Sequence, residues 1–259
     1  KKVALIGAGP ASLACAGTLA LEGHTAVIFE KRPYPGGLNT TGIAPYKLHV
    51  EDALHEVEWV TSLGVEIRTE EFTPAGAAKV LADYDAVFIG VGLGEDSKLG
   101  VPGEDGAGVT GATAWIEQMK LARGTKKQTG RVVVIGGGNT AIDVARESAL
   151  LGAESVTMIY RRGEEKMSAY KHELDGGRKE GIRVLTHVQP MEFIRDKSGK
   201  LEAVRVAKTD ENGKPIAGTE FNVPCDFAAL AIGQAKLRTL ASAFAGVEVD
   251  ARGCIKADA

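Results

Sequence analysis

Short aliphatic runs, each followed by glycines and then by a helical pattern, recur along this chain of 259 residues. The run "VALI" at residues 3–6 predicts a strand, and the glycine-rich "GAGPAS" follows it directly. Residues 13–23 have a helix-forming composition that stops at Gly23, since glycine commonly ends a helix. Residues 25–30, "TAVIFE", predict the next strand, which ends at Glu30. This order predicts a β-α-β unit around a glycine-rich turn.

The same pattern begins again at residue 131. "RVVVI" at residues 131–135 predicts a strand, "GGGNTA" a turn, residues 142–152 a helix and residues 155–160 a strand. In both copies, 16 residues separate the first glycine of the turn from the glycine that stops the helix. Two β-α-β units of matched dimensions indicate two doubly wound, Rossmann-like nucleotide-binding folds.

The segments around these two units supply further elements. Residues 51–64 have apolar side chains at near-helical spacing, and residues 65–69 and 84–92 predict strands. The glycine- and proline-rich residues 92–108 predict a linker. Residues 181–208 alternate between apolar and polar positions, which predicts antiparallel strands joined by a tight turn.

A strand resembling residues 84–92 follows the second unit. Residues 225–235 consist of an acid, a buried apolar run and then glycine, which is the same pattern. Because two such strands bracket the second unit, the sequence predicts an α/β protein with one doubly wound domain inserted into another. The predicted outer domain comprises residues 1–100 and 224–259, and the inserted domain comprises residues 101–223.

Composition and charge exclude several functional classes. Hydrophobic residues form 44% and charged residues 25% of the chain, as in ordinary globular proteins. The net charge of −3 argues against nucleic acid as a partner, because phosphate neutralisation needs a basic excess. The longest apolar runs are too short to cross a membrane. The 3 separated cysteines and 5 scattered histidines show no metal-ligand spacing, so we expect no metal site and a reducing, cytoplasmic location.

The first glycine-rich turn has the chemistry of a dinucleotide site. Gly7 and Gly9 allow a tight turn and a close approach of the backbone to a pyrophosphate, and Ser12 stands in place of the third glycine. Glu30 lies 23 residues after Gly7, where a carboxylate accepts hydrogen bonds from ribose hydroxyls. The turn therefore predicts a dinucleotide with an unphosphorylated adenosine ribose, such as FAD or NAD.

The second turn has the G-x-G-x-x-A pattern but no acid at the end of its second strand. Tyr160 stands there, and Arg161 and Arg162 follow it. An arginine pair is usually a solvated turn, but at this position it replaces a carboxylate that would repel a 2′-phosphate with two groups that bind one. Each charge-assisted hydrogen bond contributes on the order of 1.5–3 kcal/mol. We therefore expect NADP(H) to be preferred over NAD(H) about tenfold to a hundredfold or more.

The two turns together suggest a flavin in the first unit and a nicotinamide cofactor in the second. The segments "KVALIGAGPASLACAGTLA", "FEKRPYPGGLNTTGIAPYKL", "VVVIGGGNTAIDVARESALLGA" and "VTMIYRRGEEKM" carry a resemblance to a known family. The chain resembles the FAD/NADPH region of dihydropyrimidine dehydrogenase and of the glutamate synthase small subunit. This group belongs to the glutathione-reductase-like flavoproteins, which are related to the FAD/NAD(P)H-dependent pyridine nucleotide-disulfide oxidoreductases.

The resemblance assigns roles to individual residues. It implies that the FAD pyrophosphate lies on Gly7, Gly9, Pro10, Ala11 and Ser12, that Glu30 binds the FAD ribose, and that Gly36, Gly37, Leu38 and Lys47 lie along the flavin. It implies that NADPH lies on Gly136, Gly138, Asn139, Thr140, Ala141, Arg161 and Arg162, and that Lys31, Gly92, Ala231, Ile232 and Gly233 also contact cofactor. Lys47 is expected near the electron-accepting edge of the flavin ring.

The expected reaction is hydride transfer from NADPH to FAD, with the electrons passed on to a partner subunit or an iron–sulfur domain. No catalytic acid, base or cysteine is expected, because the cofactors perform the chemistry. Proteins of this group carry a cysteine-rich N-terminal region and a C-terminal Gly-Asp segment that binds FAD. This sequence has neither, so we expect a fragment or a reduced version. The alternative is a non-catalytic dinucleotide-binding or assembly module without a functional FAD site.

Overall fold

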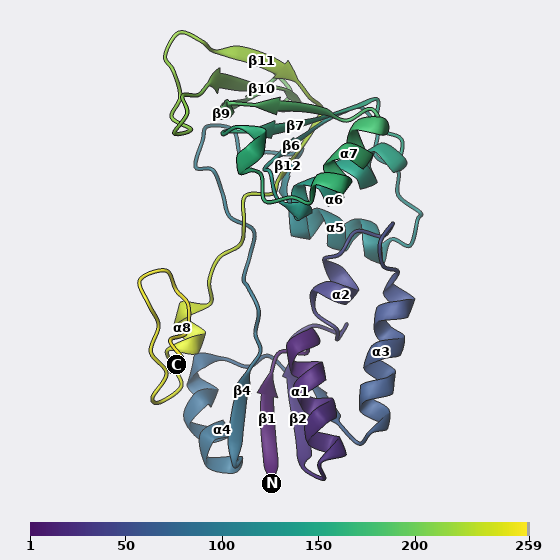
Figure 1. Cartoon of the computed structure of the whole chain (residues 1–259), viewed down its shortest axis with the longest axis vertical. Coiled ribbons are helices and arrows are strands. Elements are labelled where there is room, and N and C mark those ends of the chain that lie inside the picture. The colour runs from purple at the N-terminus through teal and green to yellow at the C-terminus, as the bar shows by residue number, and fades with distance from the viewer. Residues whose placement is uncertain (258–259) are drawn as a thin grey trace. The chain divides into compact units, whose positions relative to one another are not determined.

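The computed structural model describes residues 1–257, which form two compact units (Figure 1). Unit 1 comprises residues 1–42, 48–94 and 235–257 of the described chain. Unit 2 comprises residues 43–47 and 95–234. Each unit contains one of the glycine-rich turns and a parallel sheet of its own.

Unit 1 is built on a four-stranded parallel sheet in the order β3-β2-β1-β4. Val3 and Leu5 of β1 pack with helices α1 and α3 on one face, while Ala4 and Ile6 pack with α4 and Phe244 on the other. The elements of unit 1 are β1 (Lys2–Ile6), α1 (Pro10–Leu21), β2 (Thr25–Glu30), α2 (Leu38–Thr41), α3 (Val50–Ser62), β3 (Glu66–Thr69), η1 (Pro74–Gly76), α4 (Ala77–Asp83), β4 (Ala86–Ile89) and α8 (Arg238–Ala241).

Unit 2 contains a five-stranded parallel sheet in the order β5-β12-β6-β7-β8. Val132 and Val134 of β6 pack with α5, α6 and α7 on one face. The elements of this layer are β5 (Val109–Gly111), α5 (Ala112–Leu121), β6 (Arg131–Ile135), α6 (Asn139–Leu150), β7 (Ser155–Tyr160), η2 (Glu164–Lys166), α7 (Lys171–Lys179), β8 (Arg183–Thr186) and β12 (Phe227–Leu230).

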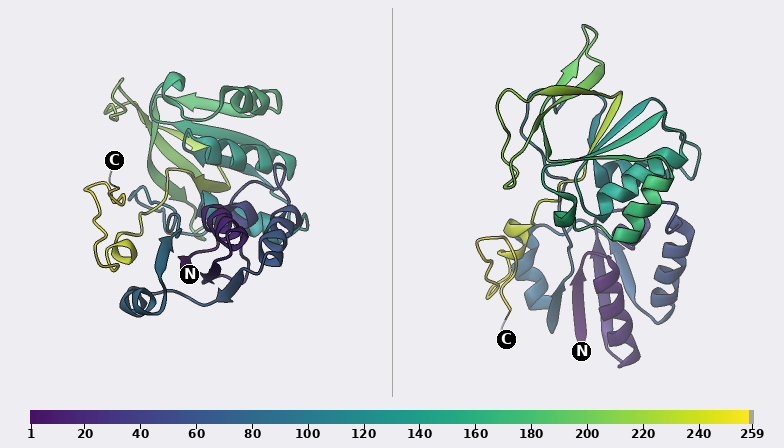
Figure 2. Two further views of the ribbon diagram at one scale, coloured as in Figure 1. Left: turned by 60° about the horizontal axis from the view of Figure 1, so that its bottom comes forward. Right: turned by 45° about the horizontal axis from the view of Figure 1, so that its top comes forward.

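A three-stranded antiparallel sheet covers the other face of the unit 2 sheet (Figures 1 and 2). Val133 and Ile135 of β6 pack there against Phe193 and Val204. Its strands are β9 (Val188–Arg195), β10 (Leu201–Lys208) and β11 (Phe221–Pro224). The expectation that all of residues 181–208 are antiparallel was partly wrong, because β8 pairs in parallel with β7 as the edge of the larger sheet.

The strand β12 lies in unit 2, which differs from the domain division expected from the sequence. It pairs with β6 on one side and β5 on the other. Arg131, at the start of β6, donates to the two carboxylate oxygens of Asp226 at 2.9 and 3.0 Å and holds the pKa of Asp226 well below its usual range. Residues 224–234 therefore belong with the second glycine-rich turn, and residues 43–47 and 95–100 also lie in unit 2.

The placement of β12 extends the internal repeat to three strands in the same order. β2-β1-β4 in unit 1 corresponds to β7-β6-β12 in unit 2. The Gly90 N–H donates to the Ile6 carbonyl oxygen at 3.0 Å, and the Ala231 N–H donates to the Ile135 carbonyl oxygen at 2.8 Å. The prediction of two doubly wound α/β folds is therefore confirmed.

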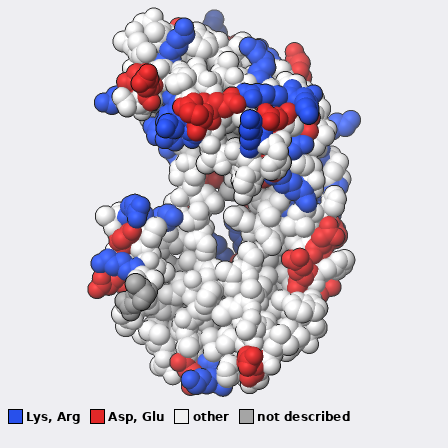
Figure 3. Space-filling view, viewed as in Figure 1, with Lys and Arg blue, Asp and Glu red and all other residues white. Residues whose placement is uncertain are grey.

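Charged side chains of both signs are interspersed on the face drawn in Figure 3. Exposed pairs include Arg205 with Glu192, whose Nη1 and Oε2 atoms lie 2.9 Å apart, and Lys79 with Asp83, whose Nζ and Oδ2 atoms lie 2.5 Å apart. Water screens such pairs strongly, so they contribute little to stability. Among residues 1–257, no helix has the length and apolar character needed to cross a bilayer.

Candidate dinucleotide-binding sites

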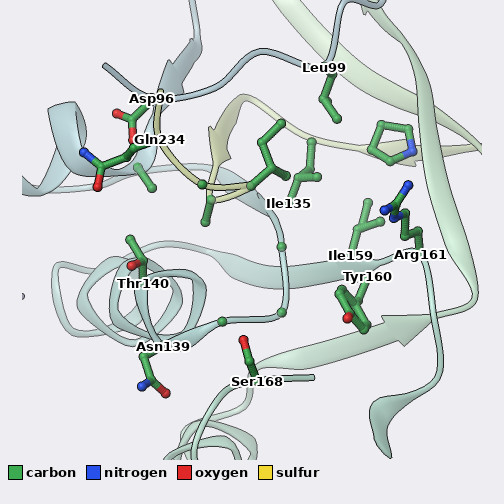
Figure 4. Close-up of a pocket in the computed structure, with 18 of the residues that line it drawn as sticks. Asp96, Leu99, Ile135, Asn139, Thr140, Ile159, Tyr160, Arg161, Ser168 and Gln234 are labelled. Atoms are coloured by element: carbon green, nitrogen blue, oxygen red, sulfur yellow. The ribbon is translucent and has the colours of Figure 1, made fainter. Parts of the chain in front are cut away.

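A cleft of about 750 Å³ opens in unit 2 across the carboxyl ends of β5, β12, β6 and β7 (Figure 4). Open α/β sheets bind ligands at this edge, where connections leave the sheet in opposite directions. The glycine-rich turn after β6 borders the middle of the cleft, Arg161 lies at one end, and Asp96 and Gln234 lie at the other. The sequence-predicted residues of the second turn are therefore brought together.

The turn after β6 requires glycine for two different reasons. Gly136 has a φ of +147°, and a Cβ there would lie 2.2 Å from the Ala231 carbonyl oxygen. Gly137 lies against the Tyr160 ring, which a Cβ would approach to 2.6 Å. Gly138 has more open surroundings and is the N-cap residue of α6, for which the described residues provide no N-cap side-chain hydrogen bond. The N–H groups of Asn139 and Thr140, in the first turn of α6, are therefore available to a phosphate.

Arg161 and Arg162 follow β7 at the basic end of the cleft. Nη2 of Arg162 donates to Tyr160 Oη at 2.8 Å, and its guanidinium carbon lies 5.6 Å from the ring centroid. Tyr160 Oη donates to the Lys166 carbonyl oxygen at 2.8 Å. The Arg161 carbonyl oxygen accepts a hydrogen bond of 2.7 Å from Thr209 Oγ1. One end of the cleft therefore carries three basic residues. The backbone of Arg161 is anchored by Thr209, the side chain of Arg162 is held by Tyr160, and Lys166 also lines the cleft.

The other end of the cleft contains residues that sequence reasoning missed. Asp96 Oδ1 accepts the Thr113 N–H at 3.2 Å, and Oδ2 accepts Thr113 Oγ1 at 2.8 Å and the Ala114 N–H at 3.1 Å. Asp96 also forms an isolated antiparallel bridge with Gln234. Asp96 follows the glycines after β4, and Gln234 follows the glycine after β12. Both strands are short apolar runs, and that similarity was the available sequence signal.

Most of the other predicted residues around the second turn also border the cleft, and Ala141 is the exception. The Asn139 side-chain oxygen accepts the Tyr170 N–H at 2.9 Å, which leaves its amide nitrogen as a potential donor. Ala141 is fully buried on α6, where it packs in the core instead of lining the cleft. Ser168, which sequence reasoning also missed, lies beside the turn (Figure 4). Thr140, Ala231, Ile232 and Gly233 line the cleft.

The first glycine-rich turn in unit 1 is joined by the "PGGL" segment. Gly7 has a φ of +89°, and a Cβ there would lie 2.8 Å from the carbonyl oxygen of Gly90 after β4. A Cβ at Gly37, whose φ is +56°, would lie 2.8 Å from Gly9 Cα. The Gly36 N–H donates to the Ala8 carbonyl oxygen at 2.8 Å. Two glycine segments distant in sequence therefore meet at the start of α1.

Glu30 ends β2 with its carboxylate turned toward this glycine-rich turn. Oε2 accepts the Ala8 N–H at 2.7 Å, and Oε1 accepts the Arg32 N–H at 2.9 Å. The residue is buried, with 8% of its surface exposed. A carboxylate has about four acceptor positions, so these two bonds fix Glu30 and leave capacity for ribose hydroxyls.

The strand register makes Glu30 and Tyr160 equivalent. Ile6, the last residue of β1, pairs with Phe29, and Glu30 follows it. Ile135, the last residue of β6, pairs with Ile159, and Tyr160 follows it. The sequence alignment that placed Tyr160 where Glu30 stands is confirmed.

The other predicted residues of unit 1 have mixed environments. Ser12 is fully buried, and a Cβ at Gly90 would lie 2.0 Å from its Oγ. The Ser12 side chain therefore lies where α1 packs against the end of β4, which is the contact that the third glycine of this motif occupies. Pro10 and Ala11 begin α1 at the surface, Lys31 and Leu38 are exposed, and Gly92 follows β4 with a φ of +66°.

Lys47 lies in unit 2, within a cluster of charged groups on α6 and α7. Its Nζ lies 2.6 Å from Asp143 Oδ1 and 2.5 Å from Glu173 Oε2. Tyr46 Oη donates to the same Asp143 oxygen at 3.2 Å, and the Arg146 guanidinium carbon lies 4.8 Å from the Tyr46 ring centroid. Burial alone would lower the pKa of Lys47, but hydrogen bonds to the two carboxylates raise it above its usual value.

Comparison with known proteins decides the family. Residues 1–259 match the family described as pyridine nucleotide-disulphide oxidoreductase. The chain belongs to this family.

Cys15, Cys225 and Cys254 are free thiols in the described part of the chain. Burial raises the pKa of Cys225 to about 12, so its thiol is protonated at neutral pH.

The curated relatives include proteins named as subunits. The chain is 37% identical to the glutamate synthase [NADPH] small chain of Escherichia coli K12, over 98% of this chain and 58% of that protein. It is 37% identical to the NADP(+)-dependent formate dehydrogenase subunit beta of Moorella thermoacetica, over 100% of this chain and 38% of that protein. The chain thus spans only part of the length of these relatives, and the resemblance to the glutamate synthase small subunit is confirmed.

Solved structures support the fold. Thioredoxin reductase of Lactococcus lactis is 22% identical with a TM-score of 0.73, over 99% of this chain and 84% of that chain. FprA of Mycobacterium tuberculosis in complex with NADPH is 19% identical with a TM-score of 0.70, over 96% and 73%. This pyridine nucleotide-disulphide oxidoreductase family member therefore has the two expected Rossmann-like folds.

Proposed function

We propose that the chain transfers hydride from NADPH to bound FAD and passes the electrons to a partner subunit or an iron–sulfur domain. The observation that carries this proposal is the contrast between two equivalent strand ends. Glu30 after β2 suits a bare ribose, whereas Arg161 and Arg162 after β7 suit a 2′-phosphate. On this basis unit 1 takes FAD and unit 2 takes NADPH.

The cleft of unit 2 has groups for each anionic part of NADPH. The uncapped first turn of α6, with Gly138, Asn139 and Thr140, would hold the pyrophosphate. Arg161 and Arg162 would bind the 2′-phosphate, with Lys166 beside them. The turn of residues 231–233 would contact the cofactor from the end of β12.

The residues present in unit 1 fit FAD. Gly9 and Gly37 leave a backbone surface without side chains at the start of α1, and the described residues provide no N-cap side-chain bond to this helix. Glu30 is already tied to the same turn by Ala8. When bound, FAD supplies the two-electron acceptor that protein side chains lack. Pro10, Ala11, Lys31, Leu38 and Gly92 would border the FAD by their positions around this turn.

Lys47 would remain cationic at neutral pH, because Asp143 and Glu173 raise its pKa. We place it at the electron-accepting edge of the flavin, where a positive charge favours gain of electrons. Asp143 and Glu173 would then act as positioning residues for the Lys47 ammonium. No side chain acts as a proton donor or as a nucleophile in this proposal.

The names of the relatives support an electron-accepting partner. A glutamate synthase small chain and a formate dehydrogenase subunit beta are parts of larger enzymes by name. An NADPH-Fe(3+) oxidoreductase subunit beta of Geobacter sulfurreducens is also 37% identical, over 90% of this chain and 37% of that protein. We therefore propose that this chain provides the NADPH-oxidising part of such an assembly.

The absorbance spectrum of the purified chain tests this function. After reconstitution with FAD and removal of the excess, near-stoichiometric flavin absorbance is expected, and anaerobic NADPH should bleach it much faster than NADH does. An Arg205→Ala variant, which removes an exposed arginine of β10, serves as a matched control and should bleach at the wild-type rate. A colourless protein that still binds NADPH would instead support the non-catalytic dinucleotide-binding module.

A further inference from the structure

The proposed function leaves the Asp96 end of the unit 2 cleft without a role. Arg161 borders one end of this cleft, the glycine-rich turn borders its middle, and Asp96 and Gln234 border the other end (Figure 4). A nucleotide with its 2′-phosphate on the arginines and its pyrophosphate on the turn extends over the ends of β12 and β5. Its nicotinamide half is thereby directed toward Asp96.

We infer that the Asp96 carboxylate is the counter-charge for the oxidised nicotinamide ring of NADP. This inference rests on the proposed function. The ring of NADPH is neutral, and loss of a hydride, which is two electrons and one proton, from C4 to the flavin leaves a ring with one positive charge. A carboxylate held at this end of the cleft stabilises the charged ring relative to the neutral one, and therefore favours hydride release.

The Asp96 carboxylate is held in place before any ligand arrives. Three hydrogen bonds from Thr113 and Ala114 fix its oxygens at 2.8–3.2 Å, and the residue is only partly exposed. A fixed charge needs no reorganisation during the reaction, which is the arrangement that stabilises developing charge best. Lys98 also lines the cleft, but its ammonium is paired with Asp105 Oδ1 at 2.5 Å.

The competing explanation is that Asp96 serves only to cap α5. A capping carboxylate stabilises a helix N-terminus by accepting its amide hydrogens. A purely structural cap would be indifferent to the charge of the nicotinamide ring. The two explanations therefore differ in whether Asp96 discriminates between a charged and a neutral ring at the same site.

Calorimetric titration of the oxidised protein with three probes separates these explanations. NADP+ has the charged ring, 1,4,5,6-tetrahydro-NADP has a neutral ring that cannot donate hydride, and adenosine 2′,5′-bisphosphate lacks the nicotinamide half. Asp96→Asn retains an acceptor for Thr113 but removes the charge. We expect it to weaken NADP+ about three- to tenfold, as for one charge pair several ångströms apart in a partly solvated site. The other two probes should change less than about twofold.

Two further variants complete the test. Glu192 of β9 forms an exposed ion pair with Arg205 of β10. Glu192→Gln removes its negative charge and should leave all three affinities unchanged. Thr113→Lys adds a positive charge beside Asp96 and should also weaken NADP+ more than the tetrahydro analogue, which provides the test if Asp96→Asn fails to fold. Equal weakening of NADP+ and the analogue, or no change in either, would overturn the inference. If the wild type fails to bind adenosine 2′,5′-bisphosphate, the NADPH site itself is wrong and the inference falls with it.

Discussion

The ammonium nitrogen of Lys47 lies 2.6 Å from Oδ1 of Asp143, on helix α6. The same nitrogen lies 2.5 Å from Glu173 Oε2 on α7, so two helices hold one lysine. Residues 43–47 belong to unit 2, although the chain on both sides of them belongs to unit 1. The cluster therefore anchors a short segment to unit 2 at a point where the chain enters and leaves that unit.

Neutralising Asp143 should loosen this segment. Asp143 is buried at 7% exposure, and Asp143→Asn leaves Lys47 with Glu173 as its charged partner. We expect a loss of about 1–3 kcal/mol in the free energy of unfolding, less than for a fully buried pair because Lys47 is partly exposed. Urea denaturation followed by fluorescence measures this loss, and hydrogen exchange at residues 43–47 should accelerate.

The exposed pair between Lys79 and Asp83 provides the matched control. Its Nζ and Oδ2 atoms lie 2.5 Å apart, a separation equal to that between Lys47 and Glu173, but the lysine side chain is 80% exposed. Asp83→Asn should therefore leave the unfolding midpoint unchanged. If both asparagine variants behave alike, burial of the Lys47 cluster does not strengthen its ion pairs.

The arginine pair after β7 should determine the choice between NADPH and NADH. Replacing Arg161 and Arg162 together by alanine removes two guanidinium groups from the 2′-phosphate end of the cleft. NADPH affinity should fall about ten- to a hundredfold, because each charge-assisted hydrogen bond contributes roughly 1.5–3 kcal/mol. NADH affinity should change little. Fluorescence titration with both nucleotides measures the ratio, and a comparable loss for NADH would show that the pair does not recognise the 2′-phosphate.

The two arginines should not contribute equally. Arg162 is oriented by Tyr160 Oη at 2.8 Å, whereas no side-chain hydrogen bond or ion pair of Arg161 is found within residues 1–257. Tyr160→Phe removes the oxygen that orients Arg162 but keeps the ring against Gly137. A preoriented group loses less entropy on binding, so this variant should weaken NADPH by a few-fold, and less than Arg162→Ala does.

The parts of the fold that the sequence predicted well are those with local signals. The strands Thr25–Glu30, Arg131–Ile135 and Ser155–Tyr160 begin and end where the sequence analysis placed them. Aliphatic, mainly β-branched residues bounded by glycine specify such buried strands without reference to the rest of the chain. The helices began three residues earlier than expected, at Pro10 and Asn139, because a dinucleotide turn leads directly into its helix.

The features that escaped prediction depend on contacts between distant residues. β12 has the same local pattern as β4, so the sequence could not show that Asp226 would join Arg131 in unit 2. The contact between Lys47 and Asp143 joins two segments that have no shared motif. Asp96 was likewise read as part of a linker, since its place in the cleft depends on the bridge to Gln234.

Two glycines of one turn should respond differently to alanine. Gly136 has a φ of +147°, and a Cβ there would lie 2.2 Å from the Ala231 carbonyl oxygen. Gly136→Ala should therefore destabilise unit 2 by at least about 2 kcal/mol. The nearest heavy atom to a Cβ at Gly138 is Ser168 Oγ at 3.4 Å, so Gly138→Ala should fold normally.

The Gly138→Ala variant should nevertheless bind NADPH poorly, because its methyl group occupies the surface that the pyrophosphate approaches. We expect about a tenfold weakening, equivalent to roughly 1.4 kcal/mol. Thermal denaturation and nucleotide titration of the two variants measure the two effects separately. Normal stability of Gly136→Ala would contradict the steric argument, and unchanged affinity of Gly138→Ala would contradict the phosphate site.

Lys120 gives unit 2 a specific dependence of stability on pH. This residue of α5 is only 2% exposed, and burial lowers its pKa from 10.5 to about 8. Between pH 8 and 10.5 the unfolded chain therefore binds more protons at this residue than the folded chain does. The contribution of Lys120 therefore makes the free energy of unfolding rise with pH across that window, by up to about 3 kcal/mol, and leaves it level below pH 8.

A Lys120→Met variant isolates this effect, because other groups also titrate in the same window. Trp115 is buried in unit 2 at 2% exposure and Trp59 lies in unit 1 at 62%, so a Trp59→Phe background makes fluorescence report on unit 2. The variant should lack the rise, so the difference between its unfolding free energy and that of the background protein should shrink from pH 8 to 10.5. Lys126→Met, which changes an exposed lysine of unit 2, should give a difference that does not vary with pH. A constant difference for Lys120→Met as well would mean that Lys120 keeps its ordinary pKa in the folded protein.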